Sequence, residues 1–184
     1  MITVLFRIGL YISSFFPLYV LLVISNYKDI PTFKDVSEIM KFKDLNAGMF
    51  WIVICALSLI SIISLAIVMK TKQPEKHTFK DINQTEDHLL NYVVTYLLPL
   101  LSIEIHKTES LLVNAGLFAL IGFLYVRNSL VYLNPLFLFF GYNLYKADNG
   151  KIIITNYNFY ELKQLQNERI YCGVLSHNIY LIRK

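Results

Sequence analysis

The most regular set of polar residues in this sequence lies on one apolar segment, between residues 88 and 106. Successive helical residues turn by about 100°, so one helix face would carry His88, Asn91, Thr95, Pro99, Ser102 and His106. Such a stripe can line a pore or a ligand path, or form a polar seam between subunits. Alternatively, Asn91, Thr95 and Ser102 hydrogen-bond to neighbouring helices and the histidines mark the membrane interfaces. The middle of the stripe has no ionisable residue to carry protons or ions.

Two groups of acidic and histidine side chains flank this stripe, and metal binding is the chemistry to consider for them. They are Glu86, Asp87 and His88 before it, and Glu104 and His106 near its end. Neither group has the helix-spaced pair of histidines of a zinc protease. The sequence also contains no nucleophile elbow, Walker loop or dinucleotide fingerprint. We therefore expect no metal, no cofactor and no enzymatic activity.

The elements that position these residues are predicted to be membrane helices. Ile8 to Tyr27 gives 20 residues without a charged side chain or histidine, and Leu45 to Met69 gives 25. A hydrocarbon core of about 30 Å needs about 20 helical residues. With two weaker segments, the sequence predicts four transmembrane spans, at about residues 3–25, 47–69, 88–106 and 110–132. We expect Pro17 to kink the first span and Asn134-Pro135 to end the fourth.

The fourth predicted span carries small residues on one face, at Ala115, Ala119 and Gly122. Small side chains let helix backbones approach closely in lipid. This face is therefore a candidate for helix packing, either within one subunit or between subunits.

The spacing of apolar residues changes after Pro135, and this predicts a different structure for the end of the chain. Asn149-Gly150 lies between apolar runs and is typical of a hairpin turn. Arg169–Leu175 and Ile179–Ile182 are typical of two more strands. The predicted fold is therefore mainly α, a polytopic membrane protein with a four-helix domain over residues 1–133 and a small β-rich cytoplasmic tail over 134–184. The polar segment between the second and third spans, from Lys70 to His88, is predicted to be a solvated connector.

The formal charge of +4 is distributed unevenly between the two sides of such a membrane protein. With four spans, the side that holds both termini carries 12 of the Lys and Arg residues, and the opposite side carries 5. The positive-inside rule then places both termini in the cytoplasm. This distribution explains the charge without direct nucleic-acid binding. Cys55 and Cys172 fall in a span and in the tail, so we expect no disulfide.

Aromatic residues are frequent in the predicted tail, and four of them are candidates for partner docking: Tyr157, Phe159, Tyr160 and Tyr171. So small a unit has too little apolar material to bury all of them. Aromatic rings left on a surface often become contact anchors. An interfacial belt of rings against the lipid headgroups is the alternative.

The order of these parts resembles the KwaA family. The residues that carry the resemblance are Tyr96-Leu97-Leu98-Pro99-Leu100-Leu101, Asn134-Pro135 and Gly141-Tyr142-Asn143-Leu144-Tyr145. KwaA is the membrane subunit of the bacterial Kiwa anti-phage defence system. The resemblance implies a homo-oligomeric, tetrameric inner-membrane protein whose cytoplasmic face binds KwaB, a DNA-binding effector. It implies no catalytic motif.

Two functions are consistent with this pattern. The first is a non-enzymatic membrane sensor and scaffold of an anti-phage complex, which docks its effector through the tail and the 70–88 connector. The alternative is a small channel or permeabilising protein that uses the polar stripe of the third span. Ion flux through liposomes would separate the two.

Overall fold

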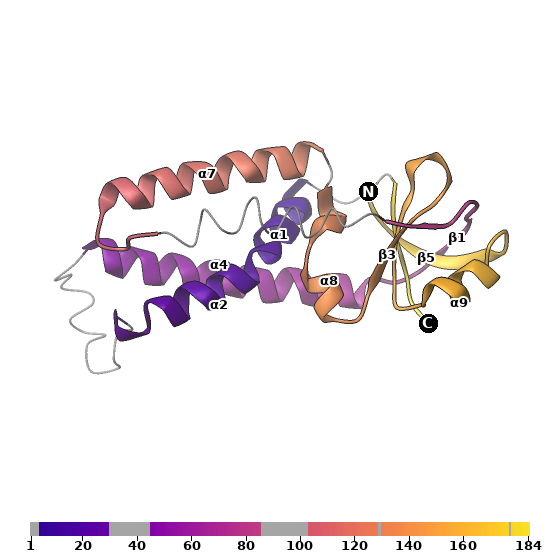
Figure 1. Ribbon diagram of the computed structural model, residues 1–184, viewed down its shortest axis with the longest axis horizontal. Coiled ribbons are helices and arrows are strands. Elements are labelled where there is room, and N and C mark those ends of the chain that lie inside the picture. The colour runs from indigo at the N-terminus through magenta and orange to yellow at the C-terminus, as the bar shows by residue number, and fades with distance from the viewer. Residues whose placement is uncertain (1–3, 30–44, 86–102, 129, 177) are drawn as a thin grey trace.

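The computed structural model describes residues 4–29, 45–85, 103–128, 130–176 and 178–184. Its helices are α1 (Val4–Ser14), α2 (Phe16–Ser25), α4 (Leu45–Lys70), α7 (Thr108–Arg127), α8 (Leu136–Phe139) and α9 (Phe159–Gln164), with the 3₁₀ helices η1 (Tyr27–Asp29), η3 (Leu130–Leu133) and η4 (Asp148–Gly150). Its strands are β1 (Glu75–Thr78), β2 (Asn83–Gln84), β3 (Asn143–Lys146), β4 (Ile152–Thr155), β5 (Arg169–Ser176) and β6 (Ile179–Ile182). The long helices lie at one end of an elongated molecule and the sheet lies at the other (Figure 1).

Two helices, α4 and α7, are long and apolar enough to cross a membrane. The pair α1 and α2 makes a third candidate span, bent by 41° between the two helices. The kink predicted at Pro17 is therefore present, and it lies slightly earlier, at Phe15. Pro17 sits in the first turn of α2, where its missing N–H has no helical partner to lose. These spans indicate a membrane protein.

Of the other two predicted spans, most of the fourth but only the end of the third lies within the described residues. The fourth is shorter than predicted, since α7 ends at Arg127, where the N–H of Asn128 donates to the carbonyl of Leu124 at 3.0 Å. The third, at residues 88–106, lies outside the described residues except for its last four. Thr85, before this gap, lies beside the sheet, where its hydroxyl donates to the Leu144 carbonyl. His106, after the gap, lies at the far end of the helices, where its carbonyl accepts from Asn46 at 3.3 Å.

Helix α1 packs between α4 and α7, and a glycine permits close packing on each side. A Cβ on Gly9 would lie 2.5 Å from the Ser64 hydroxyl oxygen of α4. A Cβ on Gly122 of α7 would lie 2.7 Å from the Cε1 atom of Tyr11. Small residues thus allow both neighbours of α1 to approach it closely, as is common between membrane helices.

The six strands form one mixed sheet in the order β1-β5-β6-β4-β3-β2. All neighbours are antiparallel except β4 and β6, which are parallel. The hairpin predicted around Asn149-Gly150 is confirmed: it joins β3 to β4, and both turn residues have positive φ, 56° and 70°. The strands predicted near the end of the chain are confirmed as β5 and β6.

The sheet also takes both of its edge strands from the segment predicted to be a solvated connector. Strands β1 and β2 come from residues 75–84, so that prediction is wrong for this part of the chain. The segment binds the sheet through Phe79 and Ile82, which are 0% and 2% exposed. Its strands are short and polar on their outer side, as edge strands often are. They therefore lack the alternation of apolar and polar residues that marks a longer strand.

The two faces of the sheet are buried against different parts of the molecule. Ile154, Leu175 and Leu181 belong to a core that continues into the membrane helices. Ile153 and Tyr180, next to them in sequence, belong to a second core beneath α9 and the 75–84 segment. This alternation follows from the two-residue period of a strand. The sheet therefore packs directly against the helices.

Candidate functional site

The junction between the helices and the sheet is held by two arginines. Arg183, just after β6, donates from Nη2 to the carbonyl oxygen of Val68, in the last turn of α4, at 2.7 Å. Arg7 of α1 donates from Nη2 to the Ser176 hydroxyl at the end of β5, at 3.0 Å. A cation near the last carbonyls of a helix also complements the negative end of the helix dipole. Two candidate spans are thus tied to two neighbouring strands.

A buried asparagine fastens the segment after α7 to α1. Asn134 is fully buried, and its Nδ2 donates to the Ser13 hydroxyl at 2.7 Å and to the Leu10 carbonyl at 3.3 Å. Its Oδ1 accepts from the N–H of Leu136 at 3.0 Å. The Asn134-Pro135 pair, expected to end the fourth span, therefore starts the turn into α8 and anchors it to the first span. Buried polar groups of this kind are costly unless they are paired, so this contact has little freedom to shift.

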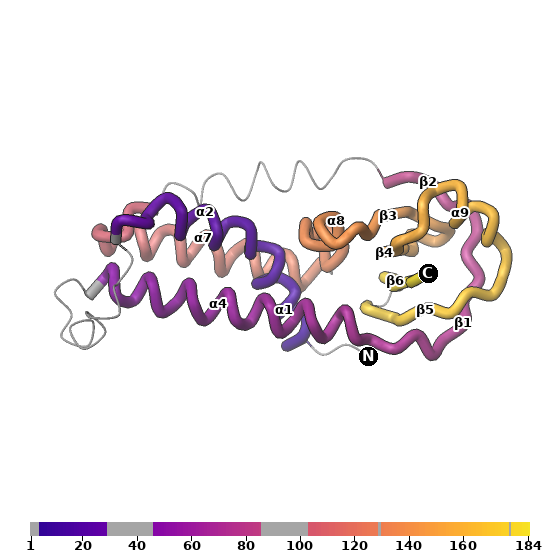
Figure 2. Tube along the Cα trace, turned by 90° about the horizontal axis from the view of Figure 1, so that it is seen from below, coloured from indigo at the N-terminus to yellow at the C-terminus, as the bar shows by residue number. Residues whose placement is uncertain are grey.

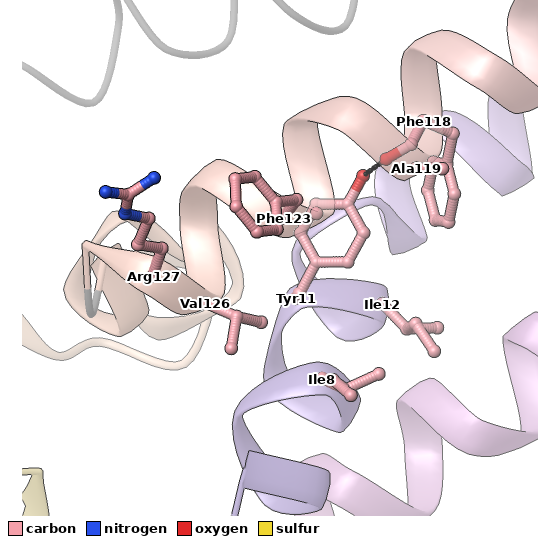
Figure 3. Close-up of a pocket in the computed structure, with 9 residues that line it drawn as sticks. Ile8, Tyr11, Ile12, Phe118, Ala119, Phe123, Val126 and Arg127 are labelled. Carbon is pink, nitrogen blue, oxygen red and sulfur yellow. Dashed lines mark hydrogen bonds between the residues drawn. The ribbon is translucent and has the colours of Figure 1, made fainter.

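The candidate packing residues of α7 do not share one environment. Gly122 is buried against the ring of Tyr11, whose hydroxyl donates to the Phe118 carbonyl (Figure 3). Ala119 is exposed and lines a groove beside this contact, whereas Ala115 is exposed and lies outside it. Within the described chain, the tight contact of this face is therefore between two helices of the same subunit.

The four candidate docking aromatics lie on two sides of the sheet. Tyr157 and Phe159 are half-buried at the edge of the core beneath α9, and Tyr160 of α9 is 78% exposed. Tyr171 of β5 is 55% exposed. It shares its strand face with Gly173, which lies close to the Lys72 carbonyl on the helix side. The structure therefore groups Tyr157, Phe159 and Tyr160 and separates Tyr171 from them.

Helix α9, which presents Tyr160, begins with a capping box that sequence reasoning missed. The Asn158 side chain accepts from the N–H of Glu161 at 2.8 Å, and the Glu161 carboxylate accepts from the N–H of Asn158 at 3.1 Å. Glu161 also accepts from the Lys184 ammonium at 2.7 Å, and this hydrogen bond, followed by that from Asn158, lowers the pKa of the carboxyl. The signal was available, because Asn-x-x-Glu is typical of a helix start.

Comparison with known proteins shows the family to which this chain belongs. The family model for the anti-phage protein KwaA matches residues 6–181, nearly the whole chain. The chain belongs to the KwaA family. No curated protein and no solved structure matches it.

For this KwaA family member, the polar stripe at Asn91, Thr95 and Ser102 lies outside the described residues. Of the flanking groups, Glu104 pairs with Lys107 at 2.6 Å. In the part of the chain that the structure describes, no three His, Cys, Asp or Glu side chains gather to hold a metal ion. Cys55 and Cys172 are both free.

Proposed function

We propose that this KwaA family member is a non-enzymatic sensor and scaffold in the bacterial inner membrane. In this proposal four spans anchor and oligomerise the chain, as a tetramer, with both termini in the cytoplasm. The sheet then docks the cytoplasmic DNA-binding effector of the Kiwa system, KwaB. The observation that carries the proposal is the junction, where the sheet shares one core with the candidate membrane helices.

A sensor must convert a change in the bilayer into a change on its inner face, and this requires different contacts in two states. In this proposal, the contacts that change are the hydrogen bonds from Arg183 to Val68 and from Arg7 to Ser176. Each joins a helix end to a strand, so a shift of α1 or α4 along its axis would change the distance between donor and acceptor. The sheet, braced by two cores, would then move with the helices.

The docking surface in this proposal is the side of the sheet that faces away from the helices. There, α9 lies at the end of the molecule remote from the long helices (Figure 1). Tyr160 of α9 is exposed with its ring centre 6.0 Å from that of Phe159, and Phe159 and Tyr157 pack at the edge of the core beneath α9. Lys163 lies 5.5 Å from the Phe159 ring and Lys184 lies 5.8 Å from the Tyr157 ring. Exposed aromatic rings at the end of the molecule remote from the helices suit contact with a soluble protein.

The proposal is tested by capture of KwaB on the full chain, solubilised in mild detergent. Tyr160→Ala should weaken capture roughly tenfold or more, as loss of an aromatic anchor does. Tyr27→Ala is the matched control, since Tyr27 is 62% exposed but lies at the opposite end of the helices. It should leave capture unchanged.

Tyr171→Ala distinguishes the two sides of the sheet. Capture should survive this change if α9 is the docking surface. Loss of capture in Tyr171→Ala but not in Tyr160→Ala would move the docking surface to the β1–β5 edge. Capture that survives both substitutions would show that the effector does not bind through these aromatics.

A further inference from the structure

A groove runs along the outside of the contact between α1 and α7. Its volume is about 540 Å³, and its lining is almost entirely apolar. Tyr11 and Ile12 of α1 form one wall, and Ala119 and Phe123 of α7 form the other (Figure 3). From Phe118 to Arg127 the lining of α7 extends over ten residues, and the nine helical rises between them cover about 14 Å. The groove therefore has the shape and polarity to hold a hydrocarbon chain.

One end of the groove carries a positive charge. Arg127, the last residue of α7, is exposed and is part of the lining. Its guanidinium carbon lies 5.8 Å from the Phe123 ring centre. Within the described ranges, Arg127 forms no ion pair. The guanidinium is therefore available to an anionic group above the groove, and its planar geometry suits a phosphate.

The charged end lies where the lipid headgroups of a membrane would be. In both views, α8 and the C-terminal end of α7 lie near the level at which α4 ends and the sheet begins (Figures 1 and 2). At this level Lys70 ends α4. Lysines near the ends of membrane helices typically extend to the headgroup interface. The apolar part of the groove extends from this level towards the middle of the candidate spans.

We propose that this groove binds one acyl chain of an anionic phospholipid and that Arg127 contacts the lipid phosphate. The complementarity of the two parts favours this occupant: an apolar channel in the hydrocarbon region ends at a cation at headgroup level. The inference goes beyond the proposed sensor function and requires only that α1 and α7 lie in a bilayer.

The test uses the full chain in mild detergent, with bound lipid counted by native mass spectrometry. The probes are phosphatidylglycerol, which carries the phosphate, and diacylglycerol, which lacks it. The unaltered protein should retain phosphatidylglycerol in preference to diacylglycerol. Arg127→Gln should weaken retention of phosphatidylglycerol roughly tenfold, through loss of a charge-assisted contact. Arg127→Lys should restore most of the preference, and Lys70→Gln, a control at the same level, should leave it intact.

The acyl-chain site is tested separately from the phosphate contact. Ala119→Phe places a ring in the groove and should reduce retention of both lipids. Ala115→Phe is the matched control on the same helix, exposed but outside the lining, and should have no effect. The proposal is wrong if Arg127→Gln keeps the preference for phosphatidylglycerol, or if Ala119→Phe retains both lipids normally. A changed number of chains per particle in Ala119→Phe alone would show that a second copy of this chain fills the groove.

Discussion

Arg183 reaches across the junction to the carbonyl oxygen of Val68, 2.7 Å away. The acceptor lies in the last turn of α4, and the donor belongs to the penultimate residue of the chain. The longest candidate span and the last strand are thereby joined by one charge-assisted hydrogen bond, the stronger class of hydrogen bond in proteins. The contribution of this contact to stability can be measured.

We predict that Arg183→Ala lowers the free energy of unfolding by about 1.5–3 kcal/mol, the usual range for a hydrogen bond to a charged group. Arg169→Ala is the control, since Arg169 is exposed at the start of β5. It should change stability by less than about 0.5 kcal/mol. Thermal unfolding in detergent gives both values. Equal loss of stability in the two variants would show that the contact with Val68 adds nothing specific.

The glycines of α7 give a second prediction with an internal control. Gly122→Ala should destabilise the protein by about 1–3 kcal/mol, as overpacking does, because its Cβ would lie 2.7 Å from the Tyr11 ring. Gly116→Ala has nothing within 4 Å of its added Cβ and should stabilise the helix by about 0.5–1 kcal/mol. Chemical denaturation of the two variants provides the comparison. Adding Tyr11→Leu to Gly122→Ala should recover part of the loss, because it removes the ring that clashes.

The thiol of Cys172 gives a prediction about pH. Burial, and after it the negative charge of Glu75, raise the pKa of this thiol to about 11. In a Cys55→Ala background, Cys172 should therefore react slowly with a water-soluble thiol reagent at pH 7.5 and faster as the pH approaches 11. Because the folded pKa lies above the unfolded value of about 8.5, the stabilising contribution is complete below pH 8.5 and is lost as the pH rises towards 11. Rapid reaction at pH 7.5 would show that the Cys172 thiol is accessible and not buried.

Topology is the fourth prediction. Single cysteines at Lys34 and Lys76, in a chain without its native cysteines, should be labelled from opposite sides of the inner membrane. The expected sides are periplasmic for Lys34 and cytoplasmic for Lys76, from the positive-inside rule. Lys146, paired with Asn83 between β3 and β2, is a control that should follow Lys76. If Lys34 and Lys76 were labelled from the same side, the number of spans between them would have to be even.

The features that sequence predicted best were long or carried a specific turn signal. Uninterrupted apolar runs predicted α4 and the bent pair α1–α2, and Asn149-Gly150 predicted the β3–β4 hairpin, because only left-handed backbone fits that turn. The motifs that carried the family resemblance were short and mostly apolar, yet the family that they indicated is confirmed.

Apart from the local capping box of α9, the features that sequence missed depend on contacts between distant residues. Strands β1 and β2 contain four and two residues, too few to show a period, and only pairing with β5 and β3 makes them strands. The docking aromatics were treated as one set, but Tyr160 follows the helical period of α9, whereas Tyr171 follows the pleat of β5. Tyr160 and Tyr171 therefore lie on different sides of the sheet, because one belongs to a helix and the other to a strand.

The edge strands have a consequence for how the protein is made. Residues 75–84 leave the ribosome long before residues 143–182, with which they pair, and α7 is synthesised between them. The sheet can close only when both segments reach the same compartment. A chain inserted with one span too few or too many would place them on opposite sides of the bilayer, with Phe79 and Ile82 left without their core. The sheet can therefore be completed only in a correctly inserted chain. A misinserted chain would expose apolar strands, which proteases can cleave.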